Sequence, residues 1–207
     1  MSVIRIRSIE HPMAEPSGAL RAARVIGRLE AMGLLPAGMT VTRLDRDTLR
    51  AALGPLVELG IGRETVLRLG ADDVPAEEYA GLLTRLADEL AASPVPQSEW
   101  AAVGDVLGVD LLLQLSATSP ASLRRYTTGT RTTPAALAAR LHFLALLVSD
   151  LTGSYNDYGV RRWFHRPRSQ LDGATPVQLL CGAWDPEDEG PRRVAALASA
   201  LADGSAT

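Results

Sequence analysis

The run SPASLRRYTTGTRTTP, residues 119–134, decides the fold expected for this chain, because helix-start and helix-stop residues alternate in it at short intervals. Ser119 and Pro120 suit the N-cap and the first position of a helix. Gly129 favours the end of that helix. A second start at the final proline opens a long segment, residues 134–151, whose leucines and valines recur at helical spacing. We therefore predict a short helix followed by a long packing helix.

The residues before this run complete the outline of a helix-turn-helix. Val109–Ala117 is a short apolar segment that predicts a helix, and Ser98–Gly108 predicts another with Ser98 as its N-cap. Two short helices around a tight turn, followed by a packing helix, are typical of a helix-turn-helix. Its second helix would be Pro120–Thr128, with Leu123 facing the core.

The second short helix has the side chains that a recognition helix needs. Arginine gives paired donors to guanine edges or phosphates, and hydroxyl groups reach phosphates or bases. The loop before the long helix adds backbone N–H groups that could hold a phosphate. Eight residues are the predicted DNA contacts: Ser119, Ser122, Arg124, Arg125, Tyr126, Arg131, Thr132 and Thr133. The alternative is that Arg124 and Arg125 form a solvated face paired with acidic residues of the chain's own 69–123 segment.

The charge distribution leaves both interpretations open. The chain has 207 residues and a net charge of -3. Residues 69–123 carry one arginine against nine acids, whereas residues 124–168 carry eight arginines against two acids. Such a basic block can attract a polyanion, or it can pair with acidic segments of the same chain.

The remaining sequence predicts a mostly α-helical fold with three parts. Residues 1–95 form a helical N-terminal domain of unknown role, residues 96–152 the helix-turn-helix domain, and residues 153–207 a small helical C-terminal module. The Ala92–Gln97 segment is the predicted linker because its two prolines disfavour helix. Val3–Ile9 alternates apolar and polar residues and predicts a strand, which could pair with a partner strand in a dimerisation or sensing domain.

Large aromatic side chains are concentrated early in the C-terminal module. Five of the nine aromatic residues fall between Phe143 and Phe164, which indicates a small local core or an interface anchor, and core packing is favoured for Trp163 and Phe164. The run that follows, WFHRPRSQLDGATPVQLL over residues 163–180, combines apolar positions with helix breakers. Thr175 and Pro176 there suit the start of another helix.

Both of these runs resemble known families of antitoxin-like regulators. Residues 98–152 resemble the helix-turn-helix of the Xre/lambda-repressor class. Residues 163–180 resemble the C-terminal module of Xre/MbcA/ParS-type antitoxins, and the match holds at eight positions: Trp163, Phe164, Pro167, Leu171, Gly173, Pro176, Leu179 and Leu180. The chain departs from that pattern at Arg168, where asparagine is usual, and in the longer acidic loop Ala183–Gly190. Residues 1–96 lie outside the pattern.

The resemblance implies a homodimeric transcriptional regulator that binds double-stranded DNA and autoregulates its operon. It also implies a C-terminal surface for a toxin, often of the NAD-consuming RES-domain class, near Leu180–Trp184 and 192–207. The residues expected at that partner surface are Trp163, Phe164, Leu180, Trp184, Arg192 and Gly204. Two alternatives stay open: a protein-interaction module without DNA binding, and a stand-alone regulator with no toxin.

Catalytic, metal and membrane functions have little support in the sequence. The three histidines are far apart, and a Cys181–His165 pair would lack a third orienting group. Cys181 is expected to be a small buried hydrophobe, His142 a core residue and His165 a surface residue. No nucleotide-binding glycine motif occurs. We expect no enzyme activity, cofactor or metal. The charged N-terminus and the absence of an uninterrupted apolar run predict a cytoplasmic protein without a membrane span.

Overall fold

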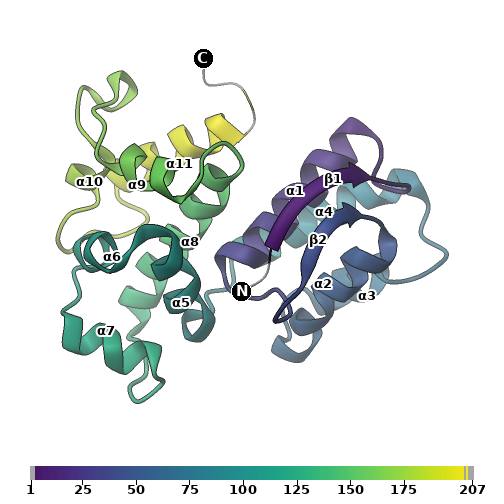
Figure 1. Ribbon diagram of the computed structural model, residues 1–207, viewed down its shortest axis with the longest axis horizontal. Coiled ribbons are helices and arrows are strands. Elements are labelled where there is room, and N and C mark those ends of the chain that lie inside the picture. Colours follow the sequence, from purple (N-terminus) through teal and green to yellow (C-terminus); the bar gives the residue numbers. More distant parts are fainter. Residues whose placement is uncertain (1–2, 203, 205–207) are drawn as a thin grey trace. The chain divides into compact units, whose positions relative to one another are not determined.

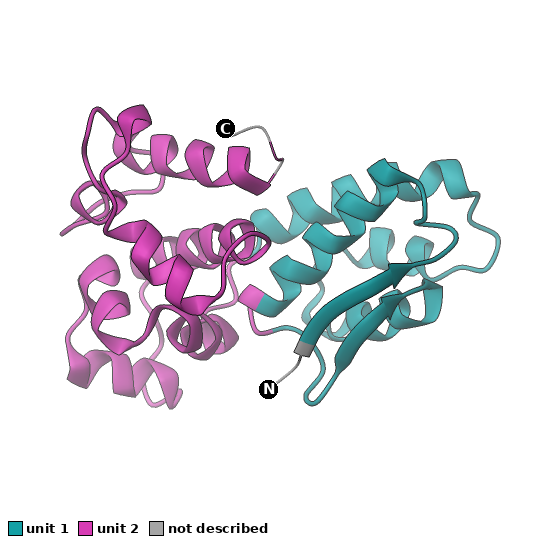
Figure 2. Cartoon of the chain, turned by 45° about the horizontal axis from the view of Figure 1, so that its top comes forward, with its two compact units in different colours: residues 1–30, 34–93 teal, residues 31–33, 94–207 magenta. Residues whose placement is uncertain are grey.

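The computed structural model describes residues 3–202 and residue 204. It is mostly helical, at 64% helix, with a small two-stranded parallel sheet, which confirms the mostly α-helical part of the predicted fold class. The chain divides into two compact units (Figure 2). Unit 1 comprises residues 1–30 and 34–93, and unit 2 comprises residues 31–33 and 94–207. Separate domains over residues 96–152 and 153–207 stay a prediction.

Unit 1 is built on the two strands β1 (Val3–Ile9) and β2 (Thr40–Leu44), which pair in parallel with Ile4 opposite Val41 and Ile9 opposite Leu44. A parallel pair needs a crossover connection, and a helix supplies it here. The helices of the unit are α1 (Pro16–Ala31), α2 (Arg46–Leu59), α3 (Arg63–Leu69) and α4 (Ala76–Ala91) (Figure 1).

Local signals account for both ends of α2 in unit 1. Helix α2 begins after Asp45, whose carboxylate accepts a hydrogen bond from the backbone N–H of Thr48 at 2.8 Å. That bond stabilises the ionised carboxylate and lowers the pKa of Asp45. The helix ends at Gly60, which adopts a left-handed conformation with φ 73°. Helix α3 was not predicted from the sequence, and its preceding Gly62 offers no side-chain cap.

Unit 2 is arranged around one long apolar helix. Its elements follow in chain order: α5 (Pro96–Leu107), α6 (Val109–Ser116), α7 (Pro120–Thr127), α8 (Ala135–Thr152), α9 (Asp157–Phe164), the 3-10 turn η1 (Ser169–Leu171), α10 (Pro176–Leu179) and α11 (Glu189–Ala202). Helix α8 packs against α5, α6, α9 and α11. A helix surrounded on several sides is expected to be apolar all round, as α8 is.

Helix α8 is also long and apolar enough to cross a membrane, by length and composition alone. Eight of its residues are buried within unit 2: Leu141, His142, Leu144, Ala145, Leu147, Val148, Ser149 and Leu151. The apolar side chains of α8 therefore pack within unit 2.

The end of unit 2 follows its predicted helix starts and turns. Thr175 caps α10 in a reciprocal arrangement with Gln178, and Pro176 begins the helix, as expected. The preceding turn contains Gly173 with φ 81°. Two local expectations are wrong. Helix α5 begins at Pro96, so Ser98 lies inside it and is not the N-cap. Cys181 is exposed, because the helix before it has already ended.

Candidate nucleic-acid interface

Helix α7 has the predicted start and lies after a tight turn. The hydroxyl of Ser119 accepts a hydrogen bond from the backbone N–H of Ser122 at 3.2 Å, and Pro120 is the first helical residue. The turn between α6 and α7 contains Ala117, which has a left-handed backbone with φ 51° and ψ 39°. A short helix, a three-residue turn and a second short helix follow the order of elements expected of a helix-turn-helix.

The orientation of α7 depends on an aromatic stack with α5. The rings of Trp100 and Tyr126 lie 5.6 Å apart between centroids and are nearly parallel, with 10° between their planes. Tyr126 is only 7% exposed. The expectation that Tyr126 projects outward is therefore wrong, because its ring fills the space between α7 and α5. Leu123, three residues earlier on the same side, is half-buried.

The opposite side of α7 presents its arginines to solvent. With about 100° between successive residues, Ala121, Arg124 and Thr128 lie on the side of α7 opposite Tyr126 and Arg125 lies at the border of that side; all four are exposed. We call these four residues the outer face of α7. Ala121 and Thr128 were not predicted from the sequence, although their i, i+3, i+4 and i+7 spacing with the arginines was a usable signal. Ser122 is half-buried and lies on the same side of the helix as Tyr126.

The guanidinium groups of the outer face have no acidic partner in the described part of the chain. No carboxylate lies within 4.0 Å of Arg124 or Arg125, and Arg125 donates only to the Ala121 carbonyl of its own helix. Several arginines elsewhere are paired with carboxylates: Arg68 contacts Glu78 at 2.8 Å, for example. The alternative in which these two arginines pair with acidic residues of the 69–123 segment therefore has no support among the described residues.

The loop after α7 extends the same basic region. Arg131 lies over the Tyr126 ring, with its guanidinium carbon 5.7 Å from the ring centroid, and it is exposed. Thr132 is exposed as well, whereas the Thr133 hydroxyl accepts a hydrogen bond from the Trp100 indole N–H at 2.9 Å. Two of the three predicted loop contacts are thus free to meet a ligand, and Thr133 helps to hold the loop against α5.

The predicted partner surface is mostly interior. Trp163, Phe164 and Leu180 are buried, and the Trp184 indole donates to the Leu115 carbonyl at 2.9 Å. Because these side chains form the core around α8, their assignment to a partner surface is wrong. Two further residues of that prediction are exposed, Arg192 and Gly204. Of the wider expected toxin-facing segment 192–207, residues 203 and 205–207 lie outside the described residues.

Arg168 lies on this core. Its guanidinium carbon is 5.2 Å from the Trp163 ring centroid. Burial lowers the pKa of Arg168, and its Nε is a buried atom without a hydrogen-bond partner. The indole nitrogen of Trp163 is likewise buried and unpaired. Arg168 therefore acts through ring packing in this position, and not through an ion pair.

The other titratable groups singled out by sequence do not form a reaction centre. His142 is buried, as expected, with its Nδ1 2.5 Å from a carboxylate oxygen of the fully buried Glu99. His165 is exposed. Among the described residues, no group of three or more histidine, cysteine, aspartate or glutamate side chains is placed to hold a metal ion.

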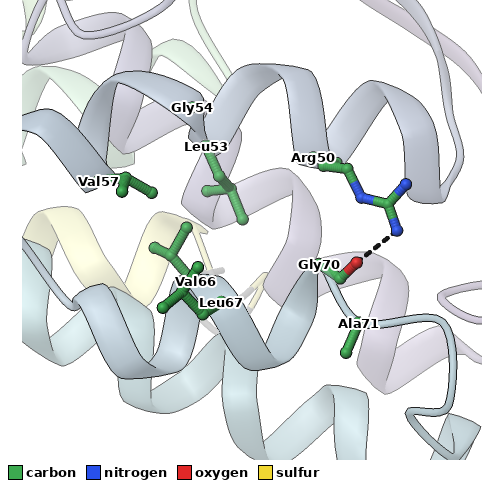
Figure 3. Close-up of a pocket in the computed structure, with 8 residues that line it drawn as sticks. All are labelled: Arg50, Leu53, Gly54, Val57, Val66, Leu67, Gly70 and Ala71. Carbon is green, nitrogen blue, oxygen red and sulfur yellow. Dashed lines mark hydrogen bonds between the residues drawn. The ribbon is translucent and has the colours of Figure 1, made fainter.

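Unit 1 contains a shallow apolar hollow of about 280 Å³ between α2 and α3 (Figure 3). Leu53, Val57 and Val66 line it, and Arg50 closes one end by donating to the Gly70 carbonyl. Arg50 is itself paired with Asp72 at 2.9 Å. None of the predicted site residues lines this hollow.

The chain was compared with family models, with curated proteins and with solved structures. No family model, curated protein or solved structure matches it.

Proposed function

We propose that this chain is a DNA-binding transcriptional regulator of the antitoxin-like kind, which uses α7 to read or grip double-stranded DNA. The observation that carries the proposal is the outer face of α7, where Arg124 and Arg125 are exposed and have no acidic partner among the described residues. Two guanidinium groups on a two-turn helix suit phosphate contacts and guanine edges. The rigid stack behind the helix fixes its orientation before DNA arrives, which reduces the entropic cost of binding.

The loop residues Arg131 and Thr132 extend the contact toward the backbone of the same duplex. In a homodimer on a palindromic site, two such helices would enter major grooves about one helical turn apart. Tyr126 takes no part in this interface, because its ring is buried against Trp100. Neutralisation of a RES-type toxin belongs to the same proposal, with exposed Arg192 and Gly204 as its remaining surface candidates.

The test is duplex binding by the full chain with a charge-matched control. Fluorescence anisotropy on a mixed-sequence duplex of about 30 base pairs gives the affinity and its salt dependence. Replacing Arg124 and Arg125 by alanine should weaken binding by about tenfold or more and lower the salt slope by about two. The control, Arg5→Ala with Arg7→Ala, removes the same charge from exposed positions of β1 and should leave both quantities nearly unchanged.

Two outcomes decide against this function. Equal loss in the two double variants would mean that only net charge matters, and α7 would have no special role. The absence of any duplex affinity near 100 mM salt would favour the alternative protein-interaction module. Co-purification of a RES-domain protein encoded next to this chain would support the toxin-neutralising part, and its failure would leave a stand-alone regulator.

A further inference from the structure

Helix α9 has a basic and aromatic face that points into solvent. Val160, Trp163 and Phe164 are buried on its inner side. At 100° per residue, Tyr158 lies at the centre of the opposite side, with Arg161 and Arg162 one turn further along on either side of it. These three residues, here called the α9 face, are all exposed.

The composition of the α9 face is typical of a binding surface. Tyr158 is 69% exposed, so most of its side chain is accessible to a partner. Tyrosine and arginine are enriched among the residues that contribute most to protein–protein binding. Arg161 donates from Nε to the Val106 carbonyl at 2.7 Å, which holds its stem in place. Within the described residues, no carboxylate lies within 4.0 Å of Arg161 or Arg162.

The same unit carries an acidic loop with the opposite charge. Asp185, Glu187, Asp188 and Glu189, here called the acidic loop, are exposed, and none forms an ion pair within the described chain. The loop is held in a defined shape. The Asp188 carboxylate accepts from the backbone N–H of Asp185 at 2.8 Å, and the Asp185 carboxylate accepts from that of Glu187 at 2.9 Å.

Buried contacts fix the start of this loop to the core of unit 2. The Trp184 ring packs edge-on against Phe143, with 5.2 Å between centroids, and its indole donates to the Leu115 carbonyl. Arg140 donates to the Trp184 carbonyl. A loop that is already ordered loses little conformational freedom when a partner binds it.

We propose that the α9 face docks onto the acidic loop of a second copy of this chain. The two surfaces are complementary in charge, and neither has an ion-pair partner among the described residues of its own copy. Under a two-fold axis each copy would give one α9 face and receive one acidic loop, so the contact closes into a dimer. Residues 94–207 contain ten arginines and eleven acidic residues, so net charge does not oppose the pairing of two such units.

This dimer surface is separate from the proposed DNA-binding helix. Figure 1 shows α7 and α9 at different ends of unit 2, with α8 between them. The α9 face can therefore be occupied by a second copy while the outer face of α7 stays free. Pairing of the α9 face with the acidic loop depends on their charge and exposure alone, and it holds whether or not the chain binds DNA.

The test uses charge reversal and measures the mass of the full chain in solution by sedimentation. The wild-type chain should dimerise at low ionic strength, and the dimer should weaken as salt rises from about 0.05 M to about 0.5 M. Reversing the face (Arg161→Glu with Arg162→Glu) should give a monomer. Replacing Glu187 and Glu189 by arginine cancels the charge of Asp185 and Asp188, so the loop becomes neutral and should also give a monomer. An equimolar mixture of the two variants should form a heterodimer, since the unchanged α9 face of the loop variant still meets the unchanged acidic loop of the face variant.

Two controls show whether dimerisation depends on the α9 face in particular. Reversing Arg124 and Arg125 changes the charge equally and should leave the dimer intact. Tyr158→Ala should weaken association by about tenfold or more. A monomeric wild-type chain at low salt, or a mixture of the two reversed variants that stays monomeric, overturns the proposal. So does a face reversal that abolishes duplex binding without changing the mass, since the α9 face would then contact nucleic acid. A dimer that binds no DNA leaves this inference standing and removes the proposed function.

Discussion

Replacing Ala117 by glycine should stabilise unit 2, because this residue occupies a backbone conformation that favours glycine. Ala117 ends α6 and opens the turn to α7 with φ 51° and ψ 39°. A left-handed conformation costs an L-residue about 1–2 kcal/mol relative to the right-handed one. The alanine side chain is exposed, so removing its methyl group sacrifices little packing.

The net increase in the free energy of unfolding for Ala117→Gly is smaller than the backbone strain that the substitution removes. Glycine loses more conformational freedom on folding than alanine, by about 0.5–1 kcal/mol. The difference leaves a stabilisation of about 0.5–1 kcal/mol for Ala117→Gly. With an m-value of about 1.5 kcal/mol/M, the urea midpoint should rise by about 0.3–0.7 M.

Tryptophan fluorescence is the suitable probe, because all three tryptophans, at positions 100, 163 and 184, belong to unit 2. The matched control is Ala101→Gly, at an exposed position in the middle of α5. That change should lower stability by about 1 kcal/mol, as glycine does inside helices. Equal destabilisation by the two substitutions would refute the reasoning, because it would show that the turn at Ala117 is not strained.

Three further predictions concern buried and capping groups. Glu99→Ala should cost about 1–3 kcal/mol in urea unfolding followed by tryptophan fluorescence, because it removes the buried carboxylate that lies 2.5 Å from Nδ1 of the buried His142; an unchanged free energy of unfolding would contradict this role. Asp45→Ala should cost about 1 kcal/mol at neutral pH by circular dichroism. The hydrogen bond from Thr48 lowers the pKa of Asp45 in the folded state. The capping stabilisation is therefore present above about pH 4 and is lost as the pH falls through the folded-state pKa. A loss of stability in Asp45→Ala that does not change with pH would contradict the cap. Tyr126→Ala should lower the free energy of unfolding by about 3 kcal/mol, whereas Tyr126→Phe should preserve both stability and duplex affinity. A loss of duplex affinity in Tyr126→Phe would show that the tyrosine hydroxyl does contact DNA.

Local chemistry explains which parts of the fold could be predicted from sequence. Ser119, Pro120 and Thr175 act on backbone groups within three residues, so the starts of α7 and α10 could be read directly from the sequence. The short helix α3 was missed because it begins after Gly62, which gives no side-chain signal for a helix start.

The rotation of α7 depends on a residue far away in the sequence. A tyrosine in a basic helix is a reasonable candidate for a DNA contact, but Tyr126 stacks on Trp100 of helix α5 and is buried there. The 163–184 aromatics show the same difficulty, since aromatic residues are frequent both in cores and at interfaces. Cys181 follows two leucines, yet it lies in a turn where Gly182 has φ 74°, and its side chain is exposed.

The ring behind α7 has a consequence for how selective a DNA reader of this shape would be. Helix α7 has only eight residues, so its orientation depends on the contacts it makes with other elements. The Trp100 indole makes two of these contacts: it stacks on Tyr126 of α7 and donates a hydrogen bond to Thr133 in the following loop. Replacing Trp100 by a smaller residue would let α7 change its orientation, while Arg124 and Arg125 would keep their charge. The protein would then bind sites with a wider range of half-site spacings, and its affinity for duplex DNA in general would fall only later.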